Sequence, residues 1–397
     1  MRSRHGSLVM LLAFGGTLLT TSAARAAVSE WPIQMSGLLE LAASSRGKGL
    51  EANYFNAGAT MFDHYRGRLF LDGNATQQIE AHVQLVLDEI NTHPVYGAYV
   101  VVTPWEQRDA HLLAGKMPWL IGTYGPRTYG DKKPLIGTPL MYQFHTTLRG
   151  DAIPANADEL LAVAGRGQYG ITYGGATKYW RGMPVIYDFC WDTGVGIQGS
   201  AAPIEYSLAA TSGTPSMMMA AQDWNEGKSV MGRIGIQPMP MLRAGASASY
   251  GPYMASALNP SLPSGKTAND YNQILYMADL AFETGHVSLI SEGYKNRWQT
   301  PTVGDLDVWG YYAEGKVGLL NGAYVAARWE SMRFSDLADS TGAVQPWDYD
   351  IDRLEAGIGY RIARTATLKA VYQNNYILDD GVKEQHDLYG LSFVLSF

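Results

Sequence analysis

The sequence has little charge, a single cysteine and no long apolar run beyond its N-terminus. Charged residues make up 17% of the 397 positions, against about 25% in an average soluble domain. One cysteine excludes an intrachain disulfide framework and a Cys-x-x-Cys zinc site. The net charge is −7 and no Lys/Arg-rich run occurs, so no nucleic-acid partner is expected. After the N-terminus, no stretch approaches the roughly 20 apolar residues of a transmembrane helix.

Residues 1–26 have the pattern of a cleaved export signal. Arg2 and Arg4 form a short positive region, residues 8–19 are mostly apolar, and Ala24 and Ala26 give a small-x-small cleavage pattern. The apolar stretch is too short for a typical spanning helix. We therefore expect residues 27–397 to form one exported domain, either in the periplasm or extracellular space or as a barrel in the outer membrane.

The last ten residues favour the barrel. Five apolar side chains occupy every second position, which places them on one face of a strand: Tyr389, Leu391, Phe393, Leu395 and Phe397. The opposite face is mostly small or polar, and transmembrane barrel strands show this alternation, with the apolar face toward lipid. The aromatic ending is similar to the terminal signal that the barrel-assembly machinery recognises in bacterial outer-membrane proteins.

The second half of the chain alternates short turns with longer polar stretches. Short turns are predicted near residues 199–201, 238–240, 284–286, 321–322 and 364–365. Long loops are predicted at residues 212–228, 251–271, 295–305, 336–352 and 378–387. Five such hairpins give ten strands, and short periplasmic turns with long external loops are typical of outer-membrane barrels.

The first half adds six predicted strands, near residues 35–43, 66–73, 79–88, 96–103, 111–117 and 184–198. The prediction is therefore an all-β, antiparallel transmembrane barrel of 16 strands. An alternative of 18 strands places one more hairpin at residues 140–147 and 168–177. Barrels of 16–18 strands are wide enough to leave an aqueous channel.

At this point the chain resembles the outer-membrane porins, in the broad sense that includes the phosphate-selective group. The features that carry the resemblance are the export signal, the alternating hairpins and the final hairpin of residues 353–397. The resemblance implies a channel for small hydrophilic solutes in the outer membrane of a Gram-negative-type bacterium. It implies contact with outer-membrane lipid and lipopolysaccharide, and trimers are common in the family. It also implies a loop folded into the lumen, for which residues 118–183 are the matching segment.

Basic residues outnumber acidic ones by seven to four in residues 118–183. Basic side chains line anion-selective pores, so a preference for anions is hypothesised if this segment lines the constriction. The alternative is a solvated external loop. The seven candidates are Arg127, Lys132, Lys133, Arg149, Arg166, Lys178 and Arg181. Alternation along the strands adds five lumen candidates, namely Arg328, Glu330, Glu355, Arg361 and Lys369.

Motifs that resemble chemical sites depart from the patterns they suggest. Residues 194–199 match GxGxxG, but no helix pattern follows to bind a dinucleotide phosphate. The acidic run 348–352 begins like a calcium loop, but Arg353 occupies the position that requires glycine. No catalytic residue, metal site or cofactor is predicted. The alternatives to a passive channel are an outer-membrane barrel enzyme of the lipase or protease type and a scaffold barrel for a redox or export partner.

Overall fold

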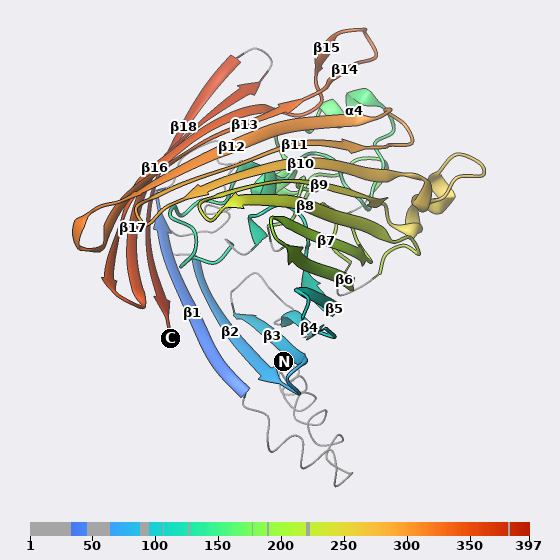
Figure 1. Cartoon of the computed structure of the whole chain (residues 1–397). Coiled ribbons are helices and arrows are strands. Elements are labelled where there is room, and N and C mark those ends of the chain that lie inside the picture. The colour runs from blue at the N-terminus through green and yellow to red at the C-terminus, as the bar shows by residue number, and fades with distance from the viewer. Residues whose placement is uncertain are drawn as a thin grey trace, which may run out of the picture.

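Sixteen antiparallel strands close into a barrel in which β1 pairs with β18 (Figure 1). The computed structural model describes residues 33–45, 64–87, 95–105, 107–125, 128–176, 178–188, 190–219, 223–379 and 382–397. The predicted export signal, residues 1–26, lies outside these residues. The prediction of an all-β antiparallel barrel of 16 strands is confirmed.

The first eight barrel strands are β1 (Ile33–Ser44), β2 (His64–Asn74), β3 (Ile79–Leu87), β4 (Val95–Val102), β5 (Ala110–Pro118), β6 (Trp191–Ala201), β7 (Ile204–Thr211) and β8 (Ser229–Met239). The other eight are β9 (Leu242–Pro252), β10 (Asn272–Glu283), β11 (Val287–Trp298), β12 (Leu306–Gly318), β13 (Ala323–Phe334), β16 (Asp350–Ala363), β17 (Ala366–Asp379) and β18 (Val382–Ser396). A separate hairpin joins β14 (Asp336–Ala338) to β15 (Val344–Pro346).

The helices are short and lie in the connections between strands. They are α3 (Leu140–Gln143), α4 (Ala157–Leu161) and the 3-10 helices η3 (Gly167–Tyr169), η4 (Ser256–Ser261), η5 (Ala268–Asp270) and η6 (Leu320–Gly322). Among the residues that the structure describes, no helix has the length and apolar composition needed to cross a membrane.

Alternation along the strands separates an apolar outer face from a polar inner face. In β16, Ile358 and Tyr360 are exposed on the outside, whereas Arg353 and Glu355 are fully buried inside. The five C-terminal apolar residues share the outer face of β18: Tyr389, Leu391 and Phe397 are exposed, and Phe393 and Leu395 are partly exposed. An apolar outer face matches a barrel whose strands contact lipid.

One predicted loop is wrong. Residues 378–387 are not a long loop, because β17 continues to Asp379 and β18 begins at Val382, with these two residues paired across the turn. The polar side chains of this region pair with each other between the strands: the Asn374 amide donates to Asp387, and the Asn375 amide donates to the His386 carbonyl. Strand pairing is made by the backbone, so it continues through polar sequence beyond the apolar belt.

The alternative of 18 strands is also wrong. Residues 140–147 begin with the helical turn α3, and η3 occupies 167–169, so the extra hairpin does not form. The apolar side chains Leu140 and Phe144 are buried in the apolar cluster of the interior. They bury their surface there and not against lipid, which removes the reason for a lipid-facing strand.

Candidate functional site: the barrel lumen

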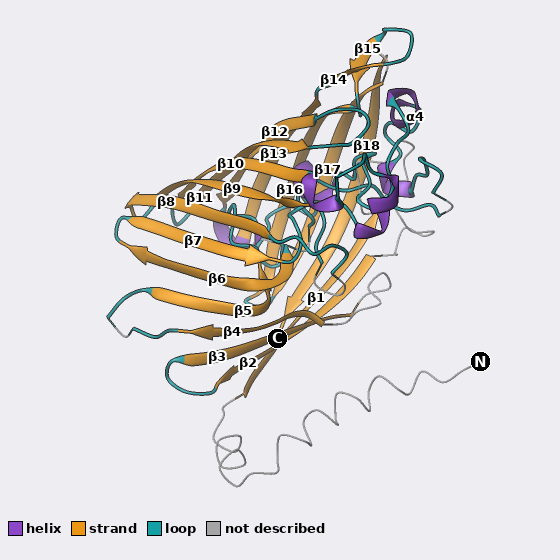
Figure 2. Cartoon of the chain, turned by 90° about the vertical axis from the view of Figure 1, so that its right-hand side faces the viewer, coloured by secondary structure: helices purple, strands orange, loops and turns teal. Residues whose placement is uncertain are grey.

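The connection between β5 and β6, residues 119–190, is called the inserted segment here. Figure 2 shows its loops and short helices among the strands of the barrel. It makes hydrogen bonds with side chains from many strands around the wall: the Leu120 carbonyl accepts from Ser207 of β7, the Gly122 amide donates to Ser247 of β9, and the Gly137 amide donates to Glu355 of β16. Contacts with such widely separated strands place the segment inside the lumen.

A buried group of charges on β12, β13 and β16 holds the segment around Gly137. The Arg328 guanidinium donates to Glu314 at 3.0 Å, Glu330 at 2.8 Å and Glu355 at 2.7 Å, and it donates to the Gly137 carbonyl at 3.0 Å. All four charged side chains are at most 4% exposed. A Cβ atom at residue 137 would overlap the Glu355 carboxylate, so glycine is required for this close approach.

The same group takes hydrogen bonds from the backbone of the segment. The Glu355 carboxylate accepts from the amides of Ile136 and Gly137, and the Glu330 carboxylate accepts from the amide of Leu140. The Arg353 guanidinium donates to the Thr138 carbonyl. Buried charges are tolerated when they are paired and fully hydrogen-bonded, and here the backbone of the segment supplies donors that the strands lack.

A second contact region lies between β1 and β17. The Lys369 ammonium donates to the carbonyls of Gly130 and Lys133. The Lys133 ammonium donates to the Ile136 carbonyl at 2.8 Å and lies 3.6 Å from the Glu40 carboxylate. Both lysines are buried, so they bind the segment to the wall and are not open to solvent.

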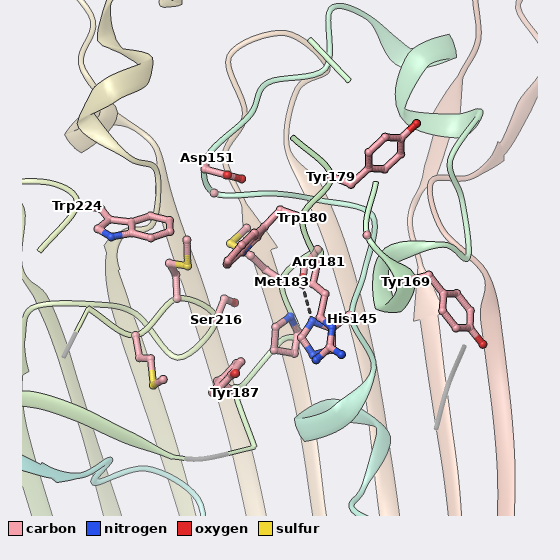
Figure 3. A pocket seen from close by; sticks show the side chains of 16 residues that line it. His145, Asp151, Tyr169, Tyr179, Trp180, Arg181, Met183, Tyr187, Ser216 and Trp224 are labelled. Carbon is pink, nitrogen blue, oxygen red and sulfur yellow. Dashed lines mark hydrogen bonds between the residues drawn. The ribbon is translucent and has the colours of Figure 1, made fainter. Parts of the chain in front are cut away.

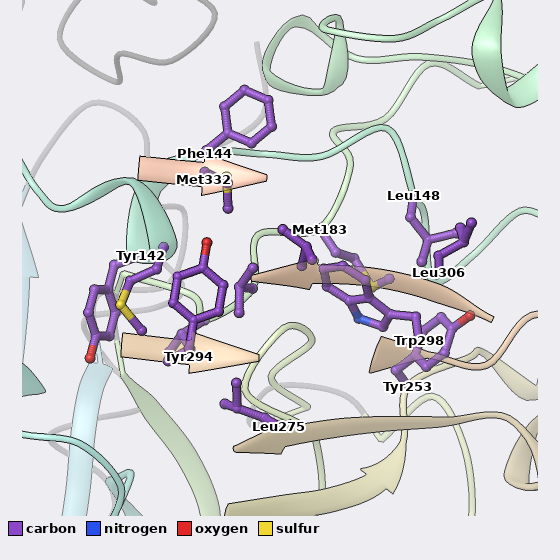
Figure 4. Packing of buried hydrophobic residues seen from close by; sticks show 14 of the residues in the cluster. Tyr142, Phe144, Leu148, Met183, Tyr253, Leu275, Tyr294, Trp298, Leu306 and Met332 are labelled. Carbon is purple, nitrogen blue, oxygen red and sulfur yellow. The ribbon is translucent and has the colours of Figure 1, made fainter. Parts of the chain in front are cut away.

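An apolar contact completes the seating of the segment. Tyr142, Phe144 and Leu148 of the segment pack on Leu275, Trp298 and other inward-facing side chains of the wall, as Figure 4 shows. The Tyr142 hydroxyl also donates to Glu292 at 2.7 Å. Because buried apolar surface is the main source of folding free energy, this packing makes the segment part of the core.

The structure disperses the seven basic residues predicted to set selectivity. Arg127 lies outside the described residues. Lys133 and Arg149 are buried in contacts with the protein: Arg149 makes a two-pronged ion pair with Asp151 at 2.8 Å. Lys132 pairs with Asp131 on the exposed surface. Arg166 and Lys178 are also exposed, whereas Arg181 is partly exposed and lines a cavity.

Of the five predicted lumen residues, Arg328, Glu330, Glu355 and Lys369 are buried on the inner face, in contact with the inserted segment. Arg361 shares the strand face of Glu355 but is exposed near the short turn after β16. The sequence alternation therefore identified the face of these side chains, whereas their burial under the segment depends on contacts that it did not reveal.

Three basic side chains of the wall were missed. Arg66 and Arg68 occupy alternate positions of β2, and both are buried. The guanidinium of Arg68 lies 4.6 Å from the ring centre of Tyr129 and 5.8 Å from that of Tyr96, and the Lys116 ammonium lies 5.8 Å from the Tyr96 ring. Alternation within the predicted strand 66–73 was the signal that could have placed Arg66 and Arg68 together.

Two open cavities lie on either side of an aromatic neck. The first, of about 500 Å³, lies toward the long loops and is lined by Tyr187 and Met218 (Figure 3). The second, of about 640 Å³, is lined by Tyr99 and Trp191 and reaches the short-turn end. These four residues pack together in one cluster with Tyr96 and Val86, which we call the neck.

Glycine makes the neck compact. A Cβ atom at residue 97 would lie 2.5 Å from the Trp191 ring, so only glycine allows the ring to lie this close to β4. The Arg68 side chain adjoins the neck through Tyr96, and its buried Nη1 atom has no hydrogen-bond partner in the described part of the chain. A buried donor without an acceptor is costly.

A hydrogen-bonded chain at the short-turn end has the order of a hydrolase triad. The His111 ring joins the Thr103 hydroxyl at 2.8 Å to the Asp109 carboxylate at 2.8 Å. Ser200 also donates to Asp109, and hydrogen bonds from Ser200 and His111 lower the pKa of that carboxyl. Asp109, His111 and Ser200 line the second cavity. Sequence reasoning did not single out this group, although Thr103, Asp109 and His111 lie within nine consecutive residues.

The acidic run at 348–352 is occupied by contacts with the protein. Asp348 is buried and accepts hydrogen bonds from the amides of Thr147 and Gly165. Asp352 forms a two-pronged pair with Arg333, at 2.7 and 2.8 Å. These carboxylates therefore hold the segment and the strands, which accounts for their clustering without a calcium ion.

Comparisons with solved structures decide the fold. OmpT, an outer membrane protein of Vibrio cholerae in a trimer form, aligns with a TM-score of 0.56 at 11% identity over 92% of this chain and 99% of its own. The fold is that of an outer-membrane porin. Salmonella typhi OmpF in complex with daunomycin also aligns with this porin-like barrel, with a TM-score of 0.55 at 10% identity over 92% of this chain and 97% of its own. The outer membrane channel DcaP of Acinetobacter baumannii gives 0.56 at 10% identity over 93% and 98%.

The sequence itself adds nothing to this likeness. No protein-family model matches the chain, and no curated protein matches it. The likeness therefore concerns the arrangement of the strands, and the solute has to be argued from the residues of this chain.

Proposed function

We propose that this porin-like barrel is a passive channel for small hydrophilic solutes and that it favours anions. The observation that carries the proposal is the group of basic side chains beside the neck, where Arg68 and Lys116 each lie 5.8 Å from the ring centre of Tyr96 and Arg66 is two residues from Arg68 on β2. The acidic side chains Glu314, Glu330 and Glu355 are on the other wall and are covered by the inserted segment. Near the neck, Asp188 and Glu40 interact with Arg68, and Asp192 interacts with Lys116. Burial raises the pKa of the Asp188 carboxyl, so the basic side chains are in excess there, which favours anions.

The test is conductance of the purified chain in a planar bilayer with a potassium chloride gradient. We expect stable open channels and a reversal potential of the sign that indicates chloride preference. Replacing Arg68 with Gln should lower the chloride-to-potassium permeability ratio by at least about threefold, because a unit charge about 7 Å from an ion contributes about 0.6 kcal/mol even in water. The control is Arg364→Gln in the exposed turn between β16 and β17, which should leave the ratio unchanged.

Other outcomes contradict the proposal in separate ways. Cation preference in the unaltered chain would overturn the selectivity, and absence of conductance would overturn the channel. The Thr103, His111 and Asp109 chain makes hydrolysis the second candidate function. Turnover of a lipid or peptide ester that disappears in Thr103→Ala, together with absence of conductance, would assign that function instead.

We also propose that three copies associate through the wall of β3 to β8. Strands β3, β4, β5 and β7 have only 8 or 9 residues, against 12 to 15 in β10 to β13 and β16 to β18. The outer surface of β4 to β8 has an almost wholly apolar groove of about 740 Å³. A short wall contacts less lipid, so burial against another copy is favourable there.

Light scattering in detergent should give a protein mass of three chains. The variant Val195→Asn, in this groove, should shift the mass toward one chain, whereas Leu289→Asn on β11 should not. Both residues are exposed on the outer face, so both variants place an amide on an apolar surface. An unchanged mass in both variants, or a single-chain mass in the unaltered protein, contradicts the proposal.

A further inference from the structure

The cavity at the long-loop end contains an unusual amount of exposed aromatic surface. Tyr169, Tyr179 and Trp180 line it and are 59%, 72% and 56% exposed. Tyr187 and Trp224 add further rings to the lining, and Figure 3 shows the labelled side chains around the cavity. Large aromatic side chains that remain exposed around a concave site are a feature of binding surfaces.

Hydrogen bonds fix the conformation of the backbone that carries Tyr169, Tyr179 and Trp180. Ile171 and Trp180 exchange two backbone hydrogen bonds at 2.9 and 3.2 Å. The buried Arg149 guanidinium donates to the carbonyls of Ile171 and Lys178 while it pairs with Asp151. A site that is ordered before the ligand arrives avoids part of the entropy cost of binding.

The Asp151 carboxylate and the Ser216 hydroxyl of the cavity are already occupied, whereas the Arg181 guanidinium is not. Both oxygens of Asp151 accept from Arg149, and the Ser216 hydroxyl donates to the Val185 carbonyl and accepts from Trp298. The ring of His145 contacts the Gly182 carbonyl at 2.6 Å. Arg181 has no hydrogen bond or ion pair within 4 Å in the described ranges, and it lines the same cavity.

The aromatic side chains, the methionines and Arg181 of the cavity indicate the chemistry of the ligand. Aromatic faces with the apolar side chains of Met183 and Met217 offer contact to a flat ring. The Arg181 guanidinium offers a two-pronged partner for a carboxylate. The Asp151 carboxylate and the Ser216 hydroxyl already have partners in the protein, so neither is left to bind the hydroxyls of a sugar. We propose that this cavity binds small aromatic carboxylates at the long-loop end of the barrel.

This inference deepens the proposed channel function, on which it rests for its role in solute uptake, but binding can be measured without conductance. The cavity volume of about 500 Å³ accommodates a single-ring acid. The site lies on the long-loop side of the neck, so a solute held there has already left bulk solvent before it reaches the basic side chains beside the neck.

The test is calorimetric titration of the full chain in detergent with benzoate. We expect saturable binding that Arg181→Gln weakens by at least about tenfold, since a hydrogen bond between charged groups is lost. Benzyl alcohol, which keeps the ring, and acetate, which keeps the charge, should each bind at least about tenfold more weakly than benzoate. Arg243→Gln is the matched control, because Arg243 lines the other cavity and pairs with Glu205 at 3.0 Å.

A second variant separates the contribution of the aromatic surface. Trp180→Leu should weaken benzoate more than acetate, whereas Trp309→Leu on the outer face of β12 should change neither. Equal benzoate affinity in Arg181→Gln and the unaltered chain, or glucose binding as tightly as benzoate, would overturn the inference. Benzoate binding in a chain that shows no conductance would leave the inference standing and remove the channel function alone.

Discussion

Replacing Arg328 with methionine is expected to destabilise the folded barrel by about 3–5 kcal/mol, the usual effect of removing one partner of a buried ion pair. The Arg328 guanidinium contacts Glu314, Glu330 and Glu355, and all are buried. Methionine fills similar space but leaves three carboxylates facing Arg353 as the remaining nearby cation in the described part of this group. They must then protonate or draw water into the core.

The local consequence should be release of the inserted segment around Gly137. The Gly137 carbonyl loses its donor, and the Glu355 carboxylate that binds the Ile136 and Gly137 amides loses its countercharge. Trypsin should therefore cut after Lys132 in Arg328→Met faster than in the unaltered chain. Local opening exposes backbone that the native contacts protect.

Arg297→Met is the matched control for this prediction. Arg297 also pairs with two carboxylates, Asp305 and Asp307, but its side chain is 42% exposed. Exposed ion pairs contribute about 0–1 kcal/mol. Chemical unfolding in the same detergent measures both variants. A loss of less than about 1 kcal/mol in Arg328→Met would show that its charge network does not hold the segment.

The strands could be predicted from sequence because barrel walls repeat a local pattern. Outward residues such as Ile358 and Tyr360 and inward residues such as Glu355 alternate with period two, and turn residues interrupt the pattern. The prediction failed where polarity was taken to end a strand. At residues 378–387 the strands continue as a paired ladder, since cross-strand pairing tolerates polar side chains outside the lipid.

The lumen could be predicted only in part, because its contacts join residues far apart in the chain. Gly137 and Glu355 are 218 residues apart, and the sequence pattern around neither residue predicts their contact. The charge count over residues 118–183 also did not reveal how each of these side chains is paired. Arg149 is neutralised by Asp151 two residues later, whereas the cations beside the neck come from β2 and β5.

Acidification is expected to produce two opposing changes in stability close to residue 145. Burial lowers the pKa of His145 to about 4, and Arg181 contributes in the same direction. The unfolded chain protonates histidine near pH 6.5, so the stability that neutral His145 provides is present above pH 6.5 and is lost as pH falls toward 4. A difference of about 2.5 pKa units corresponds to about 3 kcal/mol.

Asp348, which binds the Thr147 amide two residues away from His145, acts in the opposite sense. Burial raises its pKa to about 6. A carboxyl with a raised pKa contributes stability below its unfolded value of about 3.9, and this is lost as pH rises through 6. Acidification from pH 7 to 4 should therefore gain about 3 kcal/mol at Asp348 and lose a similar amount at His145.

Single variants should uncover these opposing contributions. Asp348→Asn keeps a neutral side chain at every pH, so its stability relative to the unaltered chain should fall by about 3 kcal/mol between pH 7 and 4. His145→Gln should instead rise by a similar amount. His286→Gln, in the exposed turn after β10, is the control and should follow the unaltered chain.

Unfolding free energies at pH 7, 5.5 and 4 in one detergent give the slope of stability against pH for each variant. These slopes can be compared even if Asp348→Asn lowers stability at every pH. Parallel slopes for Asp348→Asn and His145→Gln would show that neither group titrates as its burial requires, because the two substitutions remove protonation sites with opposite linkage to folding.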